Sequence, residues 1–135
     1  MPITKIIYRF RDASVPPQYH RSYTISVIAN EATVVVSSYS KQLNECTVEL
    51  SPDGFQLVLD IIEKSQITQS PETEDAKKTI GGKIEYLQLF DNDTELLNGN
   101  THGSGTQGSG TLCGDIKAVR QYLRSLFPNF QSLLK

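Results

Sequence analysis

The chain has 135 residues and a mass of 15.0 kDa, which fits one domain of the usual length of roughly 100–200 residues. A chain of this size buries roughly two-thirds of its surface on folding, enough for a core without metal or disulfide cross-links. Thirteen Lys and Arg residues against fifteen Asp and Glu give a formal net charge of -2. This charge excludes a generally cationic protein, so we expect no nucleic-acid and no membrane partner.

The N-terminus and the cysteine count indicate the compartment. The first residues reach charged positions quickly and contain no apolar run of the secretory kind. No stretch approaches the roughly 18 apolar residues of a membrane span. Two cysteines, Cys46 and Cys113, are too few for a disulfide framework. We therefore expect a cytoplasmic protein with reduced thiols; a Cys46–Cys113 bridge is the alternative if a leader has been removed.

Alternating apolar and polar residues predict four strands in the first half of the chain. The segments are 5–11, 21–28, 32–39 and 45–50, separated by Pro16-Pro17 and by turns at 29–31 and 40–44. The apolar sets on one side are Ile6, Tyr8 and Phe10, then Tyr23, Ile25 and Val27, and finally Cys46, Val48 and Leu50. Short turns predict an antiparallel meander with one buried and one solvent-exposed face.

The sequence period changes at Ser51, where a helix start is predicted. Ser51 suits the N-cap, Pro52 fits the first helical position, and Asp53 favours the positive end of the helix dipole. The apolar positions of this helix are Phe55, Val58, Leu59 and Ile62, widened by Leu57 and Ile61. We expect it to end near residues 64–65 and to cover the sheet.

The middle of the chain alternates between polar connectors and a hairpin. Residues 66–82 contain a proline, acidic residues and two glycines, and predict a mobile connector. Strands are expected at 83–90 and 94–97, around an acidic turn. Residues 98–114 are rich in glycine and predict a mobile loop, because loops this long are usually functional or flexible.

The last part of the chain predicts a second amphipathic helix, from Asp115 to Pro128. Its apolar stripe is Ile116, Val119, Leu123 and Leu126, and Phe130, Leu133 and Leu134 follow in a tail that returns to the core. Proline ends the helix because it cannot continue the hydrogen-bond ladder.

These elements together predict an α+β fold. We expect an antiparallel meander of about four strands plus a later hairpin, with two amphipathic helices packed on one face of the sheet. Residues 1–135 form a single domain in this interpretation, with mobile loops near 66–82 and 98–114.

The glycine-rich segment contains a nucleotide-binding pattern by its letters. Residues 103–108 match G-x-G-x-x-G. A dinucleotide site requires these glycines between a buried strand and a helix of a parallel unit, and that context is missing. We expect a flexible loop; the alternative is an anion-binding nest at 110–114, against which the charge of Asp115 argues.

Cys113 is the candidate nucleophile of an enzymatic interpretation. It precedes the helix cap by two residues, where a thiol pKa can be lowered. His102 in the same segment, or His20 elsewhere, would supply the base. The candidate catalytic residues are therefore Cys113 and His102, whereas Cys46 alternates with apolar residues as a core side chain does.

Metal ligation is not indicated by the spacing of histidines and cysteines. Asp91, Asp93 and Glu95 imitate the start of a calcium loop, but Leu96 occupies the position that requires glycine. We expect an acidic hairpin turn there, and we assign no metal and no cofactor.

The most distinctive segment is 15–25, with the sequence VPPQYHRSYTI. The candidate ligand-binding residues are His20, Arg21, Tyr23 and Tyr39. Arg21 offers a bidentate fork for a carboxylate, and the tyrosines offer stacking surfaces. The alternative is a rigid corner in which the tyrosines pack and Arg21 pairs with Glu45 or Glu49.

Three stretches, VPPQYHRSYTI, SPDGFQLVLDII and the late glycine-rich turn, resemble a family of small bacterial α+β domains whose function is not assigned. The resemblance covers most of the chain and implies a β-meander with helices. It implies no catalytic residue, because these stretches are not catalytic signatures.

Three functions remain open from the sequence. The first is a non-enzymatic binding or protein-interaction module for a small-molecule or protein partner, which the absence of a catalytic constellation in a fitting context favours. The second is a small hydrolase or transferase that uses Cys113 with a histidine. The third is a structural subunit that dimerises through a sheet edge or through residues 128–135. We expect a monomer or a weak homodimer.

Overall fold

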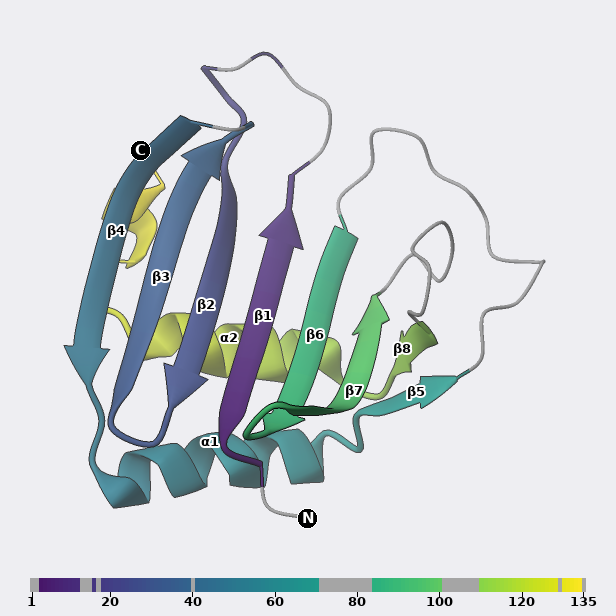
Figure 1. Ribbon diagram of the computed structural model, residues 1–135. Helices are drawn as coiled ribbons and strands as arrows, with labels where there is room; N and C mark the ends of the chain where they lie inside the picture. The colour runs from purple at the N-terminus through teal and green to yellow at the C-terminus, as the bar shows by residue number, and fades with distance from the viewer. Residues whose placement is uncertain are drawn as a thin grey trace.

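A computed structural model describes residues 3–12, 16, 18–39, 41–70, 84–100, 110–128 and 130–134. The described residues form a mostly antiparallel sheet with three helices, an α+β arrangement (Figure 1). The strands are β1 (Lys5–Arg11), β2 (Ser22–Ile28), β3 (Glu31–Ser38), β4 (Lys41–Glu49), β5 (Thr68–Ser70), β6 (Ile84–Asp91), β7 (Thr94–Asn100) and β8 (Gly110–Cys113). The helices are α1 (Pro52–Lys64), α2 (Ile116–Ser125) and α3 (Phe130–Leu133).

The sheet has the strand order β4-β3-β2-β1-β6-β7-β8-β5. The predicted meander is confirmed, since β1 to β4 pair in sequence and antiparallel. The predicted hairpin, β6 and β7, joins the meander through antiparallel pairing of β6 with β1. The pair β7/β8 is parallel. The hairpin therefore extends the same sheet.

The turn into β4 is shorter than the expected 40–44. Strand β4 begins at Lys41, and Ser38 pairs with Lys41 across the turn. Tyr39 has a φ of 55°, in the left-handed region. Such a residue reverses the chain over a very short distance, as tight hairpin turns require. The period-two pattern does not indicate a left-handed residue at Tyr39, so the predicted turn was placed too late in the chain.

Alternation along the strands selects the face that is buried. The buried hydrophobic strand residues are Ile6, Tyr8, Tyr23, Ile25, Val27, Ala32, Val34, Val36, Leu87 and Leu89. They form one core cluster with Phe55, Val58 and Ile62 of α1, Val119 and Leu123 of α2, and Phe127 and Phe130 after it. Figure 1 shows α2 crossing behind the strands and α1 running along their lower ends. The opposite side of the sheet is called the outer face below.

Helix α1 starts and ends as predicted. Ser51 is the N-cap, and its Oγ accepts a hydrogen bond from the Gly54 N–H at 3.0 Å. The expectation that Leu57 widens the buried stripe was wrong, because Leu57 is 54% exposed. Successive helical residues are about 100° apart, so Leu57 points away from the side on which Phe55 and Val58 are buried.

The two segments expected to be mobile loops contain short strands. Strand β5 lies within 66–82, and β8 lies within 98–114, where β7 also continues to Asn100. Strands β5 and β8 pair with each other over three residues. Pairing between such distant segments has no local signature in the sequence. The residues 71–83 and 101–109, with the 103–108 glycine pattern, lie outside the described ranges.

A glycine joins the end of α1 to the start of α2. Gly114 has a φ of 104°, which allows the Asp115 N–H to donate to the Ser65 carbonyl at 2.9 Å. Asp115 is the N-cap of α2, as predicted, and its carboxylate accepts the Ala118 N–H at 3.1 Å. The expected cap is confirmed.

The C-terminal tail returns to the core, as the apolar residues after Pro128 predicted. Phe130 of α3 is buried, and two carbonyls that follow accept hydrogen bonds from side chains earlier in the chain. Asn44 Nδ2 donates to the Leu133 carbonyl at 2.7 Å, and Arg21 Nε donates to the Leu134 carbonyl at 2.8 Å. The tail is thereby fixed to β4 and to the residue preceding β2.

The strand order excludes the Cys46–Cys113 bridge. Cys46 lies on β4 at one edge of the sheet and is a free thiol packed against the core, as expected. Cys113 ends β8, six strand positions away, or about 29 Å at roughly 4.8 Å per spacing. A disulfide needs Cα atoms within about 7 Å.

Candidate functional site

A pocket of about 650 Å³ lies at the end of the sheet where β1 finishes and β2 begins. Its lining residues are Arg9, Phe10, Arg11, Asp12, His20, Ser22, Tyr23, Thr24, Ser37, Tyr39 and Tyr86. Most of the strand residues among them belong to the outer face. We call this site the outer-face pocket.

The register of the strands explains why these outer-face side chains meet. Arg9 of β1 is directly opposite Thr24 on one side and Tyr86 on the other. In the next row, Ser22 is opposite Ser37. Neighbouring strands are about 4.8 Å apart, so one row brings side chains from three strands together.

His20 and Tyr39 form the end of the outer-face pocket. Their rings are stacked, with centroids 4.0 Å apart and planes 16° apart. His20 is buried, whereas Tyr39 is 54% exposed. The Tyr39 N–H donates to His20 Nδ1 at 3.0 Å, so the neutral imidazole carries its hydrogen on Nε2. His20 Nε2 faces Ser22 Oγ at 3.5 Å.

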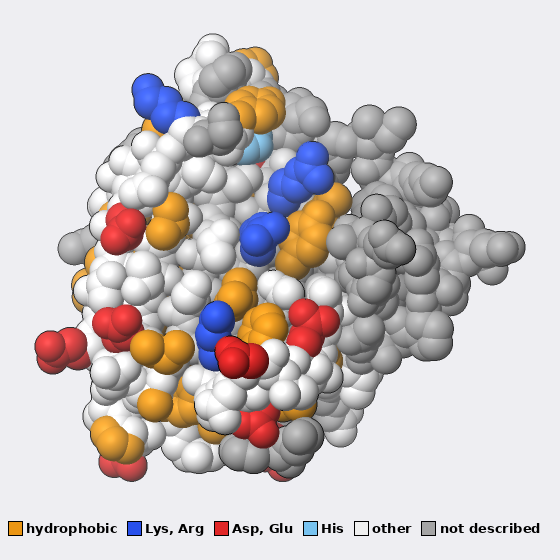
Figure 2. All heavy atoms as spheres, in the orientation of Figure 1, with side chains coloured by type: hydrophobic (Ala, Val, Ile, Leu, Met, Phe, Trp, Pro, Cys, Tyr) orange, Lys and Arg blue, Asp and Glu red, His pale blue; other side chains and the backbone are white. Residues whose placement is uncertain are grey.

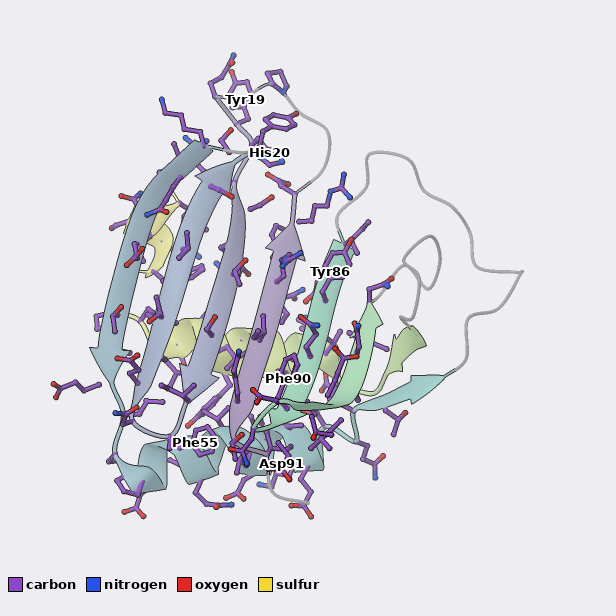
Figure 3. All side chains as sticks on the ribbon, viewed as in Figure 1. Tyr19, His20, Phe55, Tyr86, Phe90 and Asp91 are labelled. Atoms are coloured by element: carbon purple, nitrogen blue, oxygen red, sulfur yellow. The ribbon has the colours of Figure 1, made fainter. Side chains whose placement is uncertain are left out.

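The segment that carries His20 is held by local hydrogen bonds. The Pro16 carbonyl accepts from the N–H groups of Tyr19 and His20, at 2.9 and 3.1 Å. The Asp12 carboxylate accepts the Arg21 N–H at 2.9 Å, and the Asp12 N–H donates to Ser22 Oγ at 2.9 Å. These bonds fix the position of the imidazole. Of the tyrosines that the rigid-corner interpretation expects to pack, Tyr23 is buried, but Tyr19 is 69% exposed. Figure 3 shows His20 above the ends of β1 and β2, and Tyr86 near the same end of β6.

Two guanidinium groups supply the positive charge of the outer-face pocket. The Arg9 guanidinium lies over the Tyr86 ring, 5.9 Å from its centroid. Among the described carboxylates, none forms an ion pair with Arg9 or Arg11; the pair that is found joins Arg120 and Glu85. Both guanidinium groups therefore retain their capacity to bind an anion.

The positive charge is concentrated at this end of the outer face. Figure 2 shows a column of basic side chains down the middle of the sheet, with acidic groups gathered beside its lower part. Lys5, at that lower end, lies over Phe90 at 5.2 Å, and Glu95 is the next partner of Phe90 in the same row. At the lower end of the basic column, nearby carboxylates therefore reduce the net positive charge.

Of the predicted ligand-binding residues, His20 and Tyr39 are brought together at the outer-face pocket. Tyr23 borders it but is a core residue, stacked on Phe10 at 5.1 Å and 3% exposed. Arg21 does not line it; its guanidinium group donates hydrogen bonds to the carbonyls of Leu134 and His20.

The expected pairing of Arg21 with Glu45 or Glu49 is not found among the described contacts. The Glu45 carboxylate instead accepts from Gln42 at 3.3 Å. Arg21 precedes β2 and reaches the C-terminal tail, whose return position the alternation pattern does not encode.

The sequence reasoning missed Arg9, Arg11 and Tyr86. Arg9 and Arg11 alternate with core residues on β1, so their outward direction was visible, but they looked like ordinary solvent-exposed positions. Tyr86 meets Arg9 only because β6 pairs with β1. That pairing joins segments about 77 residues apart, and a single sequence gives no signal for it.

The candidate catalytic residues are only partly described. His102 lies outside the described residues, and the side chain of Cys113 is not described either. His20 precedes β2, which is four strand positions from β8, or about 19 Å at roughly 4.8 Å per spacing. This distance places His20 beyond hydrogen-bond reach of Cys113.

A second polar cluster lies on the core side of the sheet. Tyr8 donates its hydroxyl to Glu85, and Arg120 of α2 forms an ion pair with the same carboxylate at 2.9 Å. Burial, with the neighbouring Tyr23 and the bond to Glu85, raises the pKa of Tyr8. Burial also raises the pKa of Tyr23. Both phenols are therefore neutral hydrogen-bonding groups at physiological pH.

The described side chains contain no group of three or more His, Cys, Asp or Glu residues able to hold a metal ion. Within the same ranges, no helix combines the length and the apolar composition needed to cross a bilayer. No protein-family profile matches the chain, and no curated protein matches it.

Proposed function

We propose that the chain is a non-enzymatic binding module whose ligand contacts the outer-face pocket. The observation that carries the proposal is the pocket lining, in which Arg9 and Arg11 lack a described ion-pair partner beside the rings of Tyr39 and Tyr86. The volume of about 650 Å³ falls within the range of roughly 300–1,000 Å³ typical of small-molecule sites. In this proposal, the long helices cover the opposite face of the sheet and leave the outer face open.

The hydrogen bonds of His20 support binding over catalysis. A serine nucleophile needs a base that accepts its proton, and Ser22 is the hydroxyl that faces His20. His20 Nδ1 is already an acceptor for the Tyr39 N–H, so neutral His20 carries hydrogen on the nitrogen that faces Ser22. Ser22 Oγ also accepts the Asp12 N–H. This arrangement positions the ring and does not activate the hydroxyl.

Protein-observed NMR with a panel of neutral, cationic and anionic fragments tests the proposal. We expect the largest amide shifts at Thr24 and Ser37, which line the outer-face pocket. A second cavity of about 620 Å³, lined by Leu57 and Tyr122 on α1 and α2, is the internal comparison. Shifts confined to Leu57 and Tyr122, or no shifts with any fragment, would contradict the proposal.

A further inference from the structure

The charged groups of the outer-face pocket favour an anionic ligand. Two guanidinium groups, Arg9 and Arg11, and one carboxylate, Asp12, line it. The Asp12 carboxylate accepts the Arg21 backbone N–H at 2.9 Å and so helps to hold the chain entering β2. One positive charge remains in formal excess. A guanidinium presents paired N–H donors that match the two oxygens of a carboxylate or phosphate.

The aromatic groups favour a ligand with a flat ring. Tyr39 is stacked on His20 yet is 54% exposed. Tyr86 projects from the outer face beside Arg9. Aromatic rings pack against each other in offset or edge-to-face contacts, and these contacts contribute more stabilisation than their buried area alone accounts for. Tyr39 and Tyr86 line the same pocket as Arg9 and Arg11, so a ring bound there has aromatic and guanidinium groups in one cavity.

The charge beyond the outer-face pocket favours a compact ligand over a polyanion. A long anionic chain following β1 would pass Lys5, whose row ends in Glu95. Across the sheet, Glu31 is directly opposite Glu49. With the net charge of -2, these carboxylates repel an extended nucleic acid.

We infer that the outer-face pocket binds a compact molecule that joins a flat ring to an oxyanion, either a carboxylate or a phosphate. The inference rests on the proposed binding function and names the ligand class. The oxyanion contacts Arg9 and Arg11, and the ring contacts Tyr39 and Tyr86.

A matched series of small probes tests this ligand class. The ring-bearing anions are 2-naphthoate and 2-naphthyl phosphate, the neutral ring is 2-naphthamide, and the ringless anions are acetate and inorganic phosphate. We expect both ring-bearing anions to shift the amides of Thr24 and Ser37, with Kd values at least about tenfold lower than those of the other probes. Raising the salt concentration should weaken 2-naphthoate binding and leave 2-naphthamide unchanged.

Substitutions assign the two halves of the ligand to residues. Arg9→Gln and Arg11→Gln should each weaken 2-naphthoate about tenfold and leave 2-naphthamide unchanged. Tyr86→Leu should weaken both probes. The matched control is Lys5→Gln, because Lys5 is also a cation over a β6 ring on the same face but lies outside the outer-face pocket. Unchanged urea midpoints exclude unfolding as the cause.

The outcomes separate this inference from the proposed function. If 2-naphthamide binds as tightly as 2-naphthoate, the oxyanion is wrong and the binding function stands. If a ten-nucleotide oligothymidylate binds more tightly than 2-naphthyl phosphate and loses affinity with Lys5→Gln, the compact ligand is wrong. If none of the naphthyl probes binds while other fragments occupy the outer-face pocket, the ligand class is overturned and the binding function again stands.

Discussion

At the scale of single residues, polar groups in this fold are placed where they can be satisfied. Tyr8 is fully buried and gives its hydroxyl to Glu85, which Arg120 holds from the other side. The Glu85 carboxylate is 13% exposed, so removing one of its partners would be costly, and here both oxygens are bonded. The Tyr8–Glu85–Arg120 cluster therefore ties the sheet to α2.

The alkaline stability of the protein should depend on Tyr8. Its folded-state pKa is raised above the ordinary value near 10, as is that of Tyr23. Both phenols contribute stability that is present below about pH 10 and is lost as the pH rises, because the unfolded tyrosines release protons that the folded ones retain. Above pH 10, the unfolding free energy of Tyr8→Phe should therefore fall less steeply with pH than that of the parent protein. The difference in slope should be about 1.4 kcal/mol per pH unit.

Urea denaturation at pH 8, 9.5, 10.5 and 11 measures this slope. Tyr19→Phe is the matched control, because it removes the same hydroxyl group from a tyrosine that is 69% exposed and lies outside the core. At pH 8, Tyr8→Phe should itself cost about 1–2 kcal/mol through the lost hydrogen bond to Glu85. Equal alkaline slopes for Tyr8→Phe and the parent protein would contradict the argument.

At the scale of elements, the junction between α1 and α2 depends on one glycine. A Cβ at position 114 would lie 2.5 Å from the carbonyl oxygens of Ser65 and Gln66, and the φ of 104° disfavours any other residue. Gly114→Ala should therefore cost about 3 kcal/mol or more, since backbone must move to admit the methyl group.

The matched control for this junction is Gly54→Ala in α1. There the nearest atom to a new Cβ is Ser51 Oγ at 3.4 Å, and no unusual φ is present. Alanine favours the helix, so Gly54→Ala should be neutral or stabilise by about 0.5–1 kcal/mol. Thermal denaturation of both variants decides; similar losses for both would contradict the argument, because the loss would then not depend on the positive φ and the close contacts at Gly114.

The N-cap of α1 gives an independent test of the local reasoning. Ser51→Ala removes the acceptor of the Gly54 N–H and should cost about 1 kcal/mol. Ser51→Asp keeps an acceptor and should retain most of the stability. A chemical denaturation curve for each variant measures the difference; equal losses would show that the side-chain bond is not the cause.

The elements that the sequence predicted correctly are those with local signals. Ser51 and Asp115 indicated where the two long helices begin. Period-two alternation assigned the side chains of β1 to β4 to the correct face of the sheet. Strands β5 and β8 were missed because each is short and is stabilised by a partner distant in sequence. Leu57 was wrongly predicted to be buried, because the prediction counted apolar residues and ignored the position of each around the helix axis.

At the scale of the whole molecule, the candidate site is a property of the register between distant strands. His20 and Tyr39 were found from their chemistry, but the cations that accompany them were not. Arg9 and Tyr86 become neighbours through β1/β6 pairing, which only the assembled sheet defines. Residue types alone therefore indicated the His20 and Tyr39 end of the outer-face pocket. They did not indicate the two arginines that give the pocket its positive charge.

The C-terminal tail should be part of the cooperative core. Phe130 meets Tyr23 edge to face at 5.0 Å and Phe127 at 6.4 Å, and Arg124 covers its ring at 4.7 Å. Because this ring is buried between elements from both ends of the chain, Phe130→Ala should cost about 3–5 kcal/mol in urea denaturation.

The surface comparison for Phe130→Ala is Leu57→Ala, which removes an apolar side chain that is 54% exposed and should change stability by less than about 0.5 kcal/mol. The two variants differ in burial far more than in the number of atoms removed. If both lose the same small amount, α3 docks without contributing to the core. If only Phe130→Ala is strongly destabilised, packing of the Phe130 ring against the core is what stabilises the tail. The hydrogen bonds from Asn44 and Arg21 to the tail carbonyls then fix the position of a segment that the ring already holds.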